Sequence, residues 1–198
     1  MIIGITGGIG SGKSYVSQIL RERFGIPVYD CDSEAKRLTA TDEEIRRKLR
    51  ALVGPDVFQG DRLDSRRLAD FLFANADNAS QVNAIIHPAV LRDFEQWRDE
   101  HAGDKVIALE SAILYESGLD EQASLVLFID APEEVRLHRA MLRDSASEEQ
   151  IRARMRMQRP DLNRSRAQLV IDNSTSDDTR LQELLAKVVD LEQVTVQL

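Results

Sequence analysis

The chain has 198 residues, 42% of them hydrophobic and 30% charged, which is ordinary for one globular domain with small insertions. The net charge of −8 argues against a protein that wraps duplex nucleic acid, because such proteins usually present a basic face. Cys31 is the single cysteine, so no disulfide can form within the chain. With no signal-peptide pattern and no long apolar run, we expect a cytoplasmic protein without a membrane span.

Strand and helix patterns alternate at the start of the chain. Residues 2–6 are apolar and β-branched and end at glycines, which predicts a buried strand. A helix is expected at 14–24 and a second strand at 27–30. Further helices are expected at 33–39, 42–53, 66–74 and 78–101, with a loop at 54–64. No strand pattern occurs between residues 42 and 101, and we interpret that stretch as a helical insertion that forms part of a binding cleft.

The second half of the chain returns to alternation. Strands are predicted at 105–109, 124–129 and 168–172, and helices at 132–142, 147–159 and 179–191. The fold class is therefore α/β, a parallel sheet with helices on both faces, and Gly7–Ser14 after its first strand match the P-loop NTPase-type pattern. We expect a single domain with its core at 1–41 and 102–198, the insertion at about 42–101 and an arginine-rich lid at about 139–166.

A glycine-rich loop joins the first strand to the first helix. Its eight residues, from Gly7 to Ser14, match G-x-x-x-x-G-K-[ST], and the strand–loop–helix context is the one that this pattern requires. Successive backbone N–H groups in such a loop surround phosphates, and the helix N-terminus adds positive potential. Lys13 is expected to reach the β- and γ-phosphates, and the Ser14 hydroxyl to ligate Mg²⁺ bound with ATP.

Acidic side chains follow two of the predicted strands, where ligands bind in open α/β sheets. Asp30 and Asp32 end the second strand, and Glu110 ends the third. Each carboxylate is placed to orient an acceptor hydroxyl, accept its proton or hold a Mg²⁺ water. For Asp32, capping of the following helix is an equal alternative. Cys31 between them is expected to be packed rather than reactive.

Two further side chains have open interpretations. His87 stands before a proline among apolar residues and is either a buried structural histidine or an acceptor contact. Glu116, taken alone, is a surface glutamate. No cluster of histidine and cysteine predicts a zinc site.

An arginine-rich segment forms a basic island in this acidic chain. Guanidinium groups suit the charge that develops on a transferring phosphoryl group, and a lid can exclude water. Most of these arginines are expected on a solvated helix face. Arg139 and Arg143, four residues apart on one helix, are the pair expected to act. The eight arginines are residues 139, 143, 152, 154, 156, 159, 164 and 166.

Taken together, these features resemble the dephospho-CoA kinase family nearly end to end. The resemblance rests on the Thr-Gly-Gly-Ile-Gly form of the loop and on the order and spacing of six later segments: 30–32, 83–88, 110–116, 139 with 143–144, 154–158 and 171–173. Two departures occur. The family's usual Asp-[Ile/Val]-Pro-Leu-Leu-Phe-Glu is Glu-Ser-Ala-Ile-Leu-Tyr-Glu here, which makes the role of Glu110 less certain, and Tyr15 replaces a common threonine.

The resemblance implies phosphorylation of the ribose 3′-hydroxyl of dephospho-CoA by ATP with Mg²⁺, the last step of coenzyme A synthesis. It implies catalytic roles for Asp32, Lys13 and Arg139. The implied ATP-binding residues are Gly8, Gly10, Ser11, Gly12, Lys13, Ser14, Tyr15, Arg143 and Asn173, and the implied acceptor-binding residues are Asp32, His87, Glu110 and Glu116.

Two alternatives compete with this interpretation. One is a nucleoside or nucleotide kinase, which acceptor screening would separate. The other is a nucleotide-switched binding protein, although the chain lacks the Asn-Lys-x-Asp pattern of guanine-specific switches. The expected partners are ATP and dephospho-CoA, with no nucleic acid, membrane or obligate protein partner.

Overall fold

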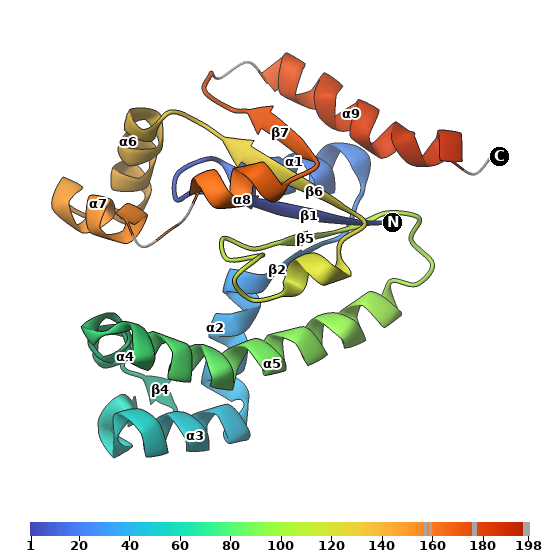
Figure 1. Cartoon of the computed structure of the whole chain (residues 1–198). Helices are drawn as coiled ribbons and strands as arrows, with labels where there is room; N and C mark the ends of the chain where they lie inside the picture. The colour runs from blue at the N-terminus through green and yellow to red at the C-terminus, as the bar shows by residue number, and fades with distance from the viewer. Residues whose placement is uncertain (157, 159, 176–177, 196–198) are drawn as a thin grey trace. The chain divides into compact units, whose positions relative to one another are not determined.

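The structure is a computed structural model that describes residues 1–156, 158, 160–175 and 178–195 (Figure 1). The chain folds into two compact units. The sheet unit comprises Met1–Tyr29 and His101–Leu198, and the helical unit comprises Asp30–Glu100. None of the described helices is both long enough and apolar enough to cross a membrane.

The sheet has five strands in the order β2-β5-β1-β6-β7, where β1 is Ile2–Gly7, β2 Val28–Asp30, β5 Ile107–Glu110, β6 Leu125–Asp130 and β7 Leu169–Asp172. The pairs β1–β5, β1–β6 and β6–β7 are parallel. In this register Ile5 lies between Glu110 and Leu127. The predicted parallel α/β sheet is confirmed, and the phosphate loop leaves the carboxyl end of its central strand.

Alternate residues of β1 pack on opposite faces of the sheet. On one face Ile3 and Ile5 join a buried cluster with α1, Lys13–Phe24, and α9, Asp178–Thr195. On the other, Gly4 lies against Leu114 and Val126. The helix α8, Pro160–Arg166, crosses in front of the central strands in Figure 1 and contacts β1 and β6.

Helices α6, Glu133–Asp144, and α7, Glu148–Arg156, share a small core of their own, made by Leu137, Ala140, Ile151 and Met155. Ile9 of the phosphate loop packs against this core, so the loop and the two helices are joined. The capping box predicted for α7 is confirmed, because Ser147 Oγ accepts from Gln150 N and Gln150 Oε1 accepts from Ser147 N.

The helical unit contains α2, Cys31–Thr41; α3, Glu43–Val53; α4, Ser65–Ala74; and α5, Ala76–Glu100. Pro88 lies inside α5. The prediction of no strand here was wrong: a short 3-10 helix, Pro55–Val57, leads into a two-stranded hairpin of β3, Phe58–Gln59, and β4, Arg62–Leu63. Strands of two residues are too short to show an alternating pattern.

Arg46 holds this hairpin onto α3. The side chain is only 7% exposed, pairs with Asp61 and Glu43, and donates to Gly60 O. Its guanidinium also lies 5.3 Å from the centre of the Phe58 ring. A long-range contact of this kind fixes the hairpin where local sequence does not.

The bounds of one predicted helix were also wrong. The helix expected over 147–159 ends at Arg156 as α7, and a separate α8 begins at Pro160. Proline fits the first position of a helix, where its missing N–H group has no helical partner. Residues 157 and 159, the second of them one of the arginines of the basic island, lie outside the described residues.

Candidate active site

The phosphate loop takes backbone conformations that need glycine. Gly10 and Gly12 have φ values of 76° and 97°, in the left-handed region that side chains disfavour. Space is also absent: a Cβ at Gly10 would lie 2.0 Å from Arg136 O, and one at Gly12 would lie 2.1 Å from Asn173 Nδ2. The sequence pattern therefore reflects both backbone geometry and close packing around the loop.

Gly12 is the N-cap of α1 and provides no side-chain acceptor. The first amide groups of this helix are therefore directed toward the loop without a capping side chain, which leaves them available to an anion. Lys13 Nζ donates to the carbonyl oxygens of Gly7 and Gly8, at 3.0 and 3.3 Å. The lysine thus lies along the inside of the loop that precedes it.

A pocket of about 190 Å³ opens at this loop. It unites seven of the residues predicted to bind ATP or to act on its phosphates: Gly10, Gly12, Lys13, Ser14, Tyr15, Arg139 and Arg143. Arg139 and Arg143 come from α6, so the loop and this helix line the same pocket. Cationic side chains and helix-terminal amides around a small pocket suit a phosphate chain.

Asn173 lies behind the loop. Its side chain is buried, and Nδ2 donates to Ser11 O at 2.7 Å, while its main-chain oxygen accepts from Arg139 Nη1 at 2.9 Å. The residue therefore ties the loop to Arg139. This arrangement gives Asn173 a supporting position next to Gly12.

Glu110 lies at the end of β5 and is buried, with 6% of the residue exposed. Its Oε1 accepts from Ser14 Oγ at 2.9 Å, and its Oε2 is buried without a hydrogen-bond partner among the described residues. The sequence predicted Ser14 as a Mg²⁺ ligand and Glu110 as a strand-end carboxylate facing the acceptor or a Mg²⁺ water, and the fold brings the two side chains into contact. A buried oxygen without a donor suits a cation.

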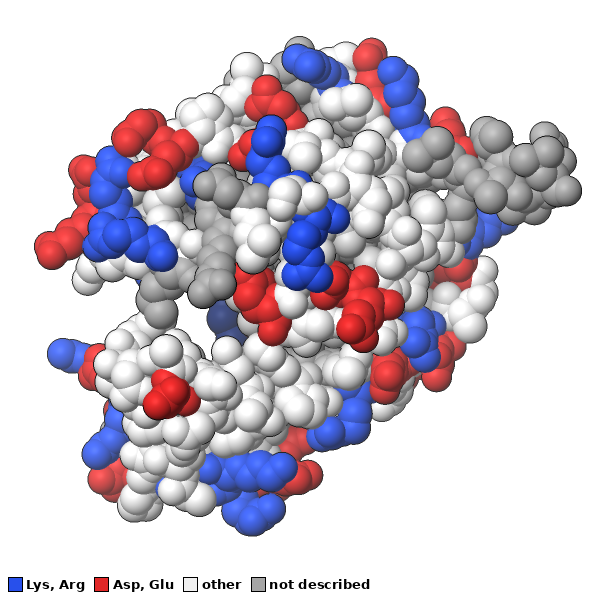
Figure 2. Space-filling model, in the orientation of Figure 1, with Lys and Arg blue, Asp and Glu red and all other residues white. Residues whose placement is uncertain are grey.

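Arg143 extends from α6 to Asp144, whose carboxylate also binds Arg154 of α7. These two guanidinium groups hold the pKa of Asp144 down, to about 2. Arg152 pairs with glutamates of both helices, and Figure 2 shows acidic and basic side chains side by side over α6 and α7. Most of this face fits the predicted solvated helix face, and its arginines form exposed ion pairs.

Two further arginines of the basic island, both in α8, attach this helix to the rest of the sheet unit. Arg164 pairs with Asp130, and Arg166 pairs with Asp120 and lies 4.0 Å from the centre of the Tyr115 ring. Glu116 is exposed and accepts from Asn163 Nδ2 at 3.0 Å. In this structure, therefore, Glu116 anchors α8.

Asp30 and Asp32 have different structural roles at the start of α2. Asp30 is the N-cap, accepting from Ser33 N at 3.0 Å and from Ser33 Oγ at 2.8 Å. Asp32 lies in the first helical turn and is exposed. The capping interpretation of Asp32 was wrong, because the helix begins two residues earlier than predicted, with Asp30 as its N-cap. Cys31 is buried, as expected.

His87 lies in α5 of the helical unit and is partly buried. Burial lowers its pKa below the usual value for histidine, because desolvation disfavours the charged imidazolium. His87 is therefore neutral at pH 7. Both His87 and Asp32 belong to the helical unit.

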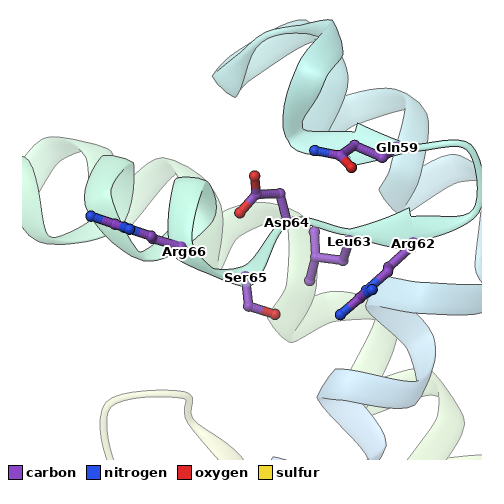
Figure 3. A pocket seen from close by; sticks show the side chains of 6 residues that line it. All are labelled: Gln59, Arg62, Leu63, Asp64, Ser65 and Arg66. Carbon is purple, nitrogen blue, oxygen red and sulfur yellow. The ribbon is translucent and has the colours of Figure 1, made fainter.

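A larger hollow of about 490 Å³ lies in the helical unit, at the hairpin and the start of α4 (Figure 3). Four of its six lining residues are exposed, Leu63 and Asp64 are half-buried, and Asp64 already caps α4 by accepting from Arg67 N. It contains none of the predicted site residues. The smaller pocket at the phosphate loop carries the chemistry and is the better candidate.

Two residues that contact the loop were missed by the sequence interpretation. Gln158 Oε1 accepts from Ile9 N at 2.8 Å. The Arg136 side chain lies on Gly8 and its carbonyl oxygen on Gly10. Arg136 precedes Arg139 by three residues on the same helix, a spacing that could have identified it.

Comparisons with known proteins identify the family of the chain. A family model described as dephospho-CoA kinase matches residues 1–178. A dephospho-CoA kinase of Bacteroides fragilis is 49% identical over 172 residues, which cover 86% of this chain and 83% of the relative. The crystal structure of TT1252 from Thermus thermophilus has a TM-score of 0.81 at 36% identity and covers 97% of both chains.

A dephospho-CoA kinase structure from Campylobacter jejuni supports the same fold, with a TM-score of 0.68, 24% identity and 98% of both chains covered. The family match extends over the phosphate loop, the two strand-end acidic segments and α6. The chain therefore belongs to the dephospho-CoA kinase family of ATP-dependent P-loop kinases.

Proposed function

We propose that the chain transfers the γ-phosphoryl group of ATP to the ribose 3′-hydroxyl of dephospho-CoA, giving ADP and coenzyme A. The observation that carries the proposal is the pocket in which the loop residues, Lys13, Arg139 and Arg143 meet, within a chain of this family. We further propose that the enzyme works in the cytoplasm and needs no nucleic acid, membrane or obligate protein partner.

In this proposal the loop amides from Gly8 to Ser14 receive the β- and γ-phosphates. Lys13 exchanges its bonds to the Gly7 and Gly8 carbonyls for phosphate oxygens, and Arg139 stabilises the charge on the transferring group. Arg143 binds the phosphates from the next turn of α6, and Tyr15 lines the same pocket. Asn173 contributes by fixing Ser11 and Arg139.

Ser14 and Glu110 would hold the Mg²⁺ that accompanies ATP. The donor set fits, because it consists of a hydroxyl and a carboxylate whose second oxygen is buried without a partner among the described residues. When bound, Mg²⁺ neutralises charge on the phosphate oxygens. The contact with Ser14 favours a role for Glu110 on the ATP side over the acceptor role expected from the sequence.

On the acceptor side, we propose that Asp32 orients the 3′-hydroxyl and accepts its proton. Support comes from its exposed position in the first turn of α2, where Asp30 already provides the cap. His87, neutral and partly buried, is proposed to help hold the acceptor. Glu116 would act indirectly by retaining α8, since its carboxylate is bound to Asn163.

The direct test is ADP formation from ATP with a panel of acceptors and mass analysis of the product. We expect rapid turnover with dephospho-CoA and a product heavier by one phosphate. With adenosine, AMP or shikimate, ADP should form only at the slow rate that is measured when no acceptor is added. Preference for a nucleoside or nucleotide over dephospho-CoA would replace the proposal with the nucleotide-kinase alternative.

A further inference from the structure

Arg136 meets the phosphate loop at two points. An ideal Cβ on Gly8 would lie 2.4 Å from Arg136 Nη1 and 3.2 Å from its Cζ, so the guanidinium rests on the Gly8 backbone. The carbonyl oxygen of Arg136 approaches Gly10 as closely, 2.0 Å from that residue's ideal Cβ. These two glycines flank Ile9, which packs against the α6–α7 core.

The Arg136 guanidinium is held in place, and no carboxylate of the described side chains pairs with its charge. Arg136 Nε donates to Ala131 O at 3.0 Å, just after the end of β6. Among the described side chains no carboxylate pairs with Arg136, whereas Arg143, Arg152 and Arg154 all bind acids of α6 or α7. A cation held beside a phosphate-binding loop without a counter-ion is arranged for an anionic ligand.

Gly8 differs from the other loop glycines in what a side chain there would meet. Gly7, Gly10 and Gly12 have positive φ values of 152°, 76° and 97°, which side chains disfavour. Gly8 does not have a positive φ of this kind. The three atoms nearest to its ideal Cβ all belong to Arg136. An alanine at this position would therefore be opposed by the arginine side chain rather than by the backbone conformation.

From these contacts we infer that Arg136 is a positioning residue for ATP, which acts through Gly8 and Gly10 by fixing the loop and adding positive charge beside the phosphates. The inference deepens the proposed function and rests on it, since ATP is the ligand concerned. It makes Gly8 and Arg136 a matched pair: the missing side chain at one position makes room for the guanidinium of the other.

Calorimetric titration of the full chain with Mg-ATP tests the pair in a double-mutant cycle. Arg136→Met and Gly8→Ala should each weaken ATP binding by roughly 10-fold, the loss expected from one weakened charge-assisted contact. The double variant should be no weaker than either single variant, because Gly8→Ala acts by displacing the guanidinium. Arg136→Lys, which retains the charge, should recover part of the loss, and KM for ATP should rise more than kcat falls.

His138→Ala, on the exposed face of the same helix, is the matched control and should bind ATP like the wild type. Wild-type affinity in Arg136→Met, no recovery with lysine, or fully additive losses in the double variant would overturn the inference. If Arg136→Met does not fold by thermal melting, Gly8→Ala and Arg136→Lys still decide the question. A wild-type chain that binds ATP but ignores dephospho-CoA would refute the proposed function and leave this inference standing.

Discussion

Lys13 is the residue whose removal should harm turnover most directly. Lys13→Ala should lower kcat by about 10²–10³ or more, because a preorganised cation on the transferring phosphate is lost. The fold should survive, since Lys13 Nζ donates to carbonyl oxygens of the loop itself, at Gly7 and Gly8. Steady-state kinetics with a thermal melt measures both. Lys187→Ala, exposed on α9, is the control, and near-normal turnover of Lys13→Ala would refute the loop assignment.

Substitutions at Asp32 and Asp30 distinguish a catalytic role from a helix-capping role. Asp32→Asn should lower kcat by roughly 10²–10⁴, because an amide cannot take the hydroxyl proton, while ATP affinity stays close to that of the wild type. Asp30→Asn should retain both activity and stability, since asparagine caps helices as well as aspartate does. Asp30→Ala should lower the free energy of unfolding by about 1 kcal/mol. Wild-type turnover of Asp32→Asn would place the base elsewhere.

The contacts of the arginines separate those that line the phosphate-loop pocket from those that attach α8. Arg139→Met and Arg143→Met should each reduce kcat/KM by the equivalent of about 2–4 kcal/mol, as for other preorganised donors. Arg164→Met and Arg166→Met should change it little, because these side chains attach α8 to Asp130 and Asp120. Kinetics on the four variants measures the contrast, and similar small effects at all four would favour a solvated face throughout.

At this scale the sequence identified the loop because its eight residues obey a local rule, and it identified Arg139 and Arg143 by helical spacing. It did not identify Arg136, whose importance depends on how closely α6 approaches Gly8 and Gly10 in three dimensions. It also assigned the possible cap to Asp32 instead of Asp30, because both residues precede the helix predicted at 33–39, and the sequence does not show which carboxylate accepts from Ser33 N.

Among the elements, α6 and α7 form a pair joined by a small core and by Asp144. The pKa of Asp144 is lowered to about 2, so this carboxylate stabilises the fold above its unfolded pKa near 3.8. That stabilisation should be lost as the pH falls from about 4 to 2. Denaturant unfolding of wild type and Asp144→Asn should therefore differ at pH 6 and converge near pH 2; a difference independent of pH would contradict this.

Continuous apolar strands and amphipathic helices were predictable because each is recorded in local periodicity. The β3–β4 hairpin was not, since it is fixed by the contacts of Arg46 with Asp61 and Gly60. The break between α7 and α8 was missed for a related reason, as α8 is retained by pairs with distant residues such as Asp120 and Glu116.

For the molecule as a whole, His87 should make stability depend on pH near neutrality. Its pKa is lowered in the folded chain, so the unfolded chain binds the proton more readily as pH falls below about 6.5. Stability should be full above that pH and decrease below it. His87→Gln should flatten the profile between pH 5 and 7 in denaturant unfolding, with His101→Gln as control; an unchanged profile would contradict a buried, neutral His87.

The central claim is phosphoryl transfer from ATP to one hydroxyl of dephospho-CoA, and the position of the new phosphate tests it most directly. The product formed by the wild-type chain should be isolated and examined by ³¹P–¹H correlation NMR. The account predicts one new phosphate monoester coupled to the ribose H3′ proton, formed by wild type and reduced to trace amounts with Lys13→Ala. Phosphate on another hydroxyl, or no new ester while ATP is consumed, would contradict it.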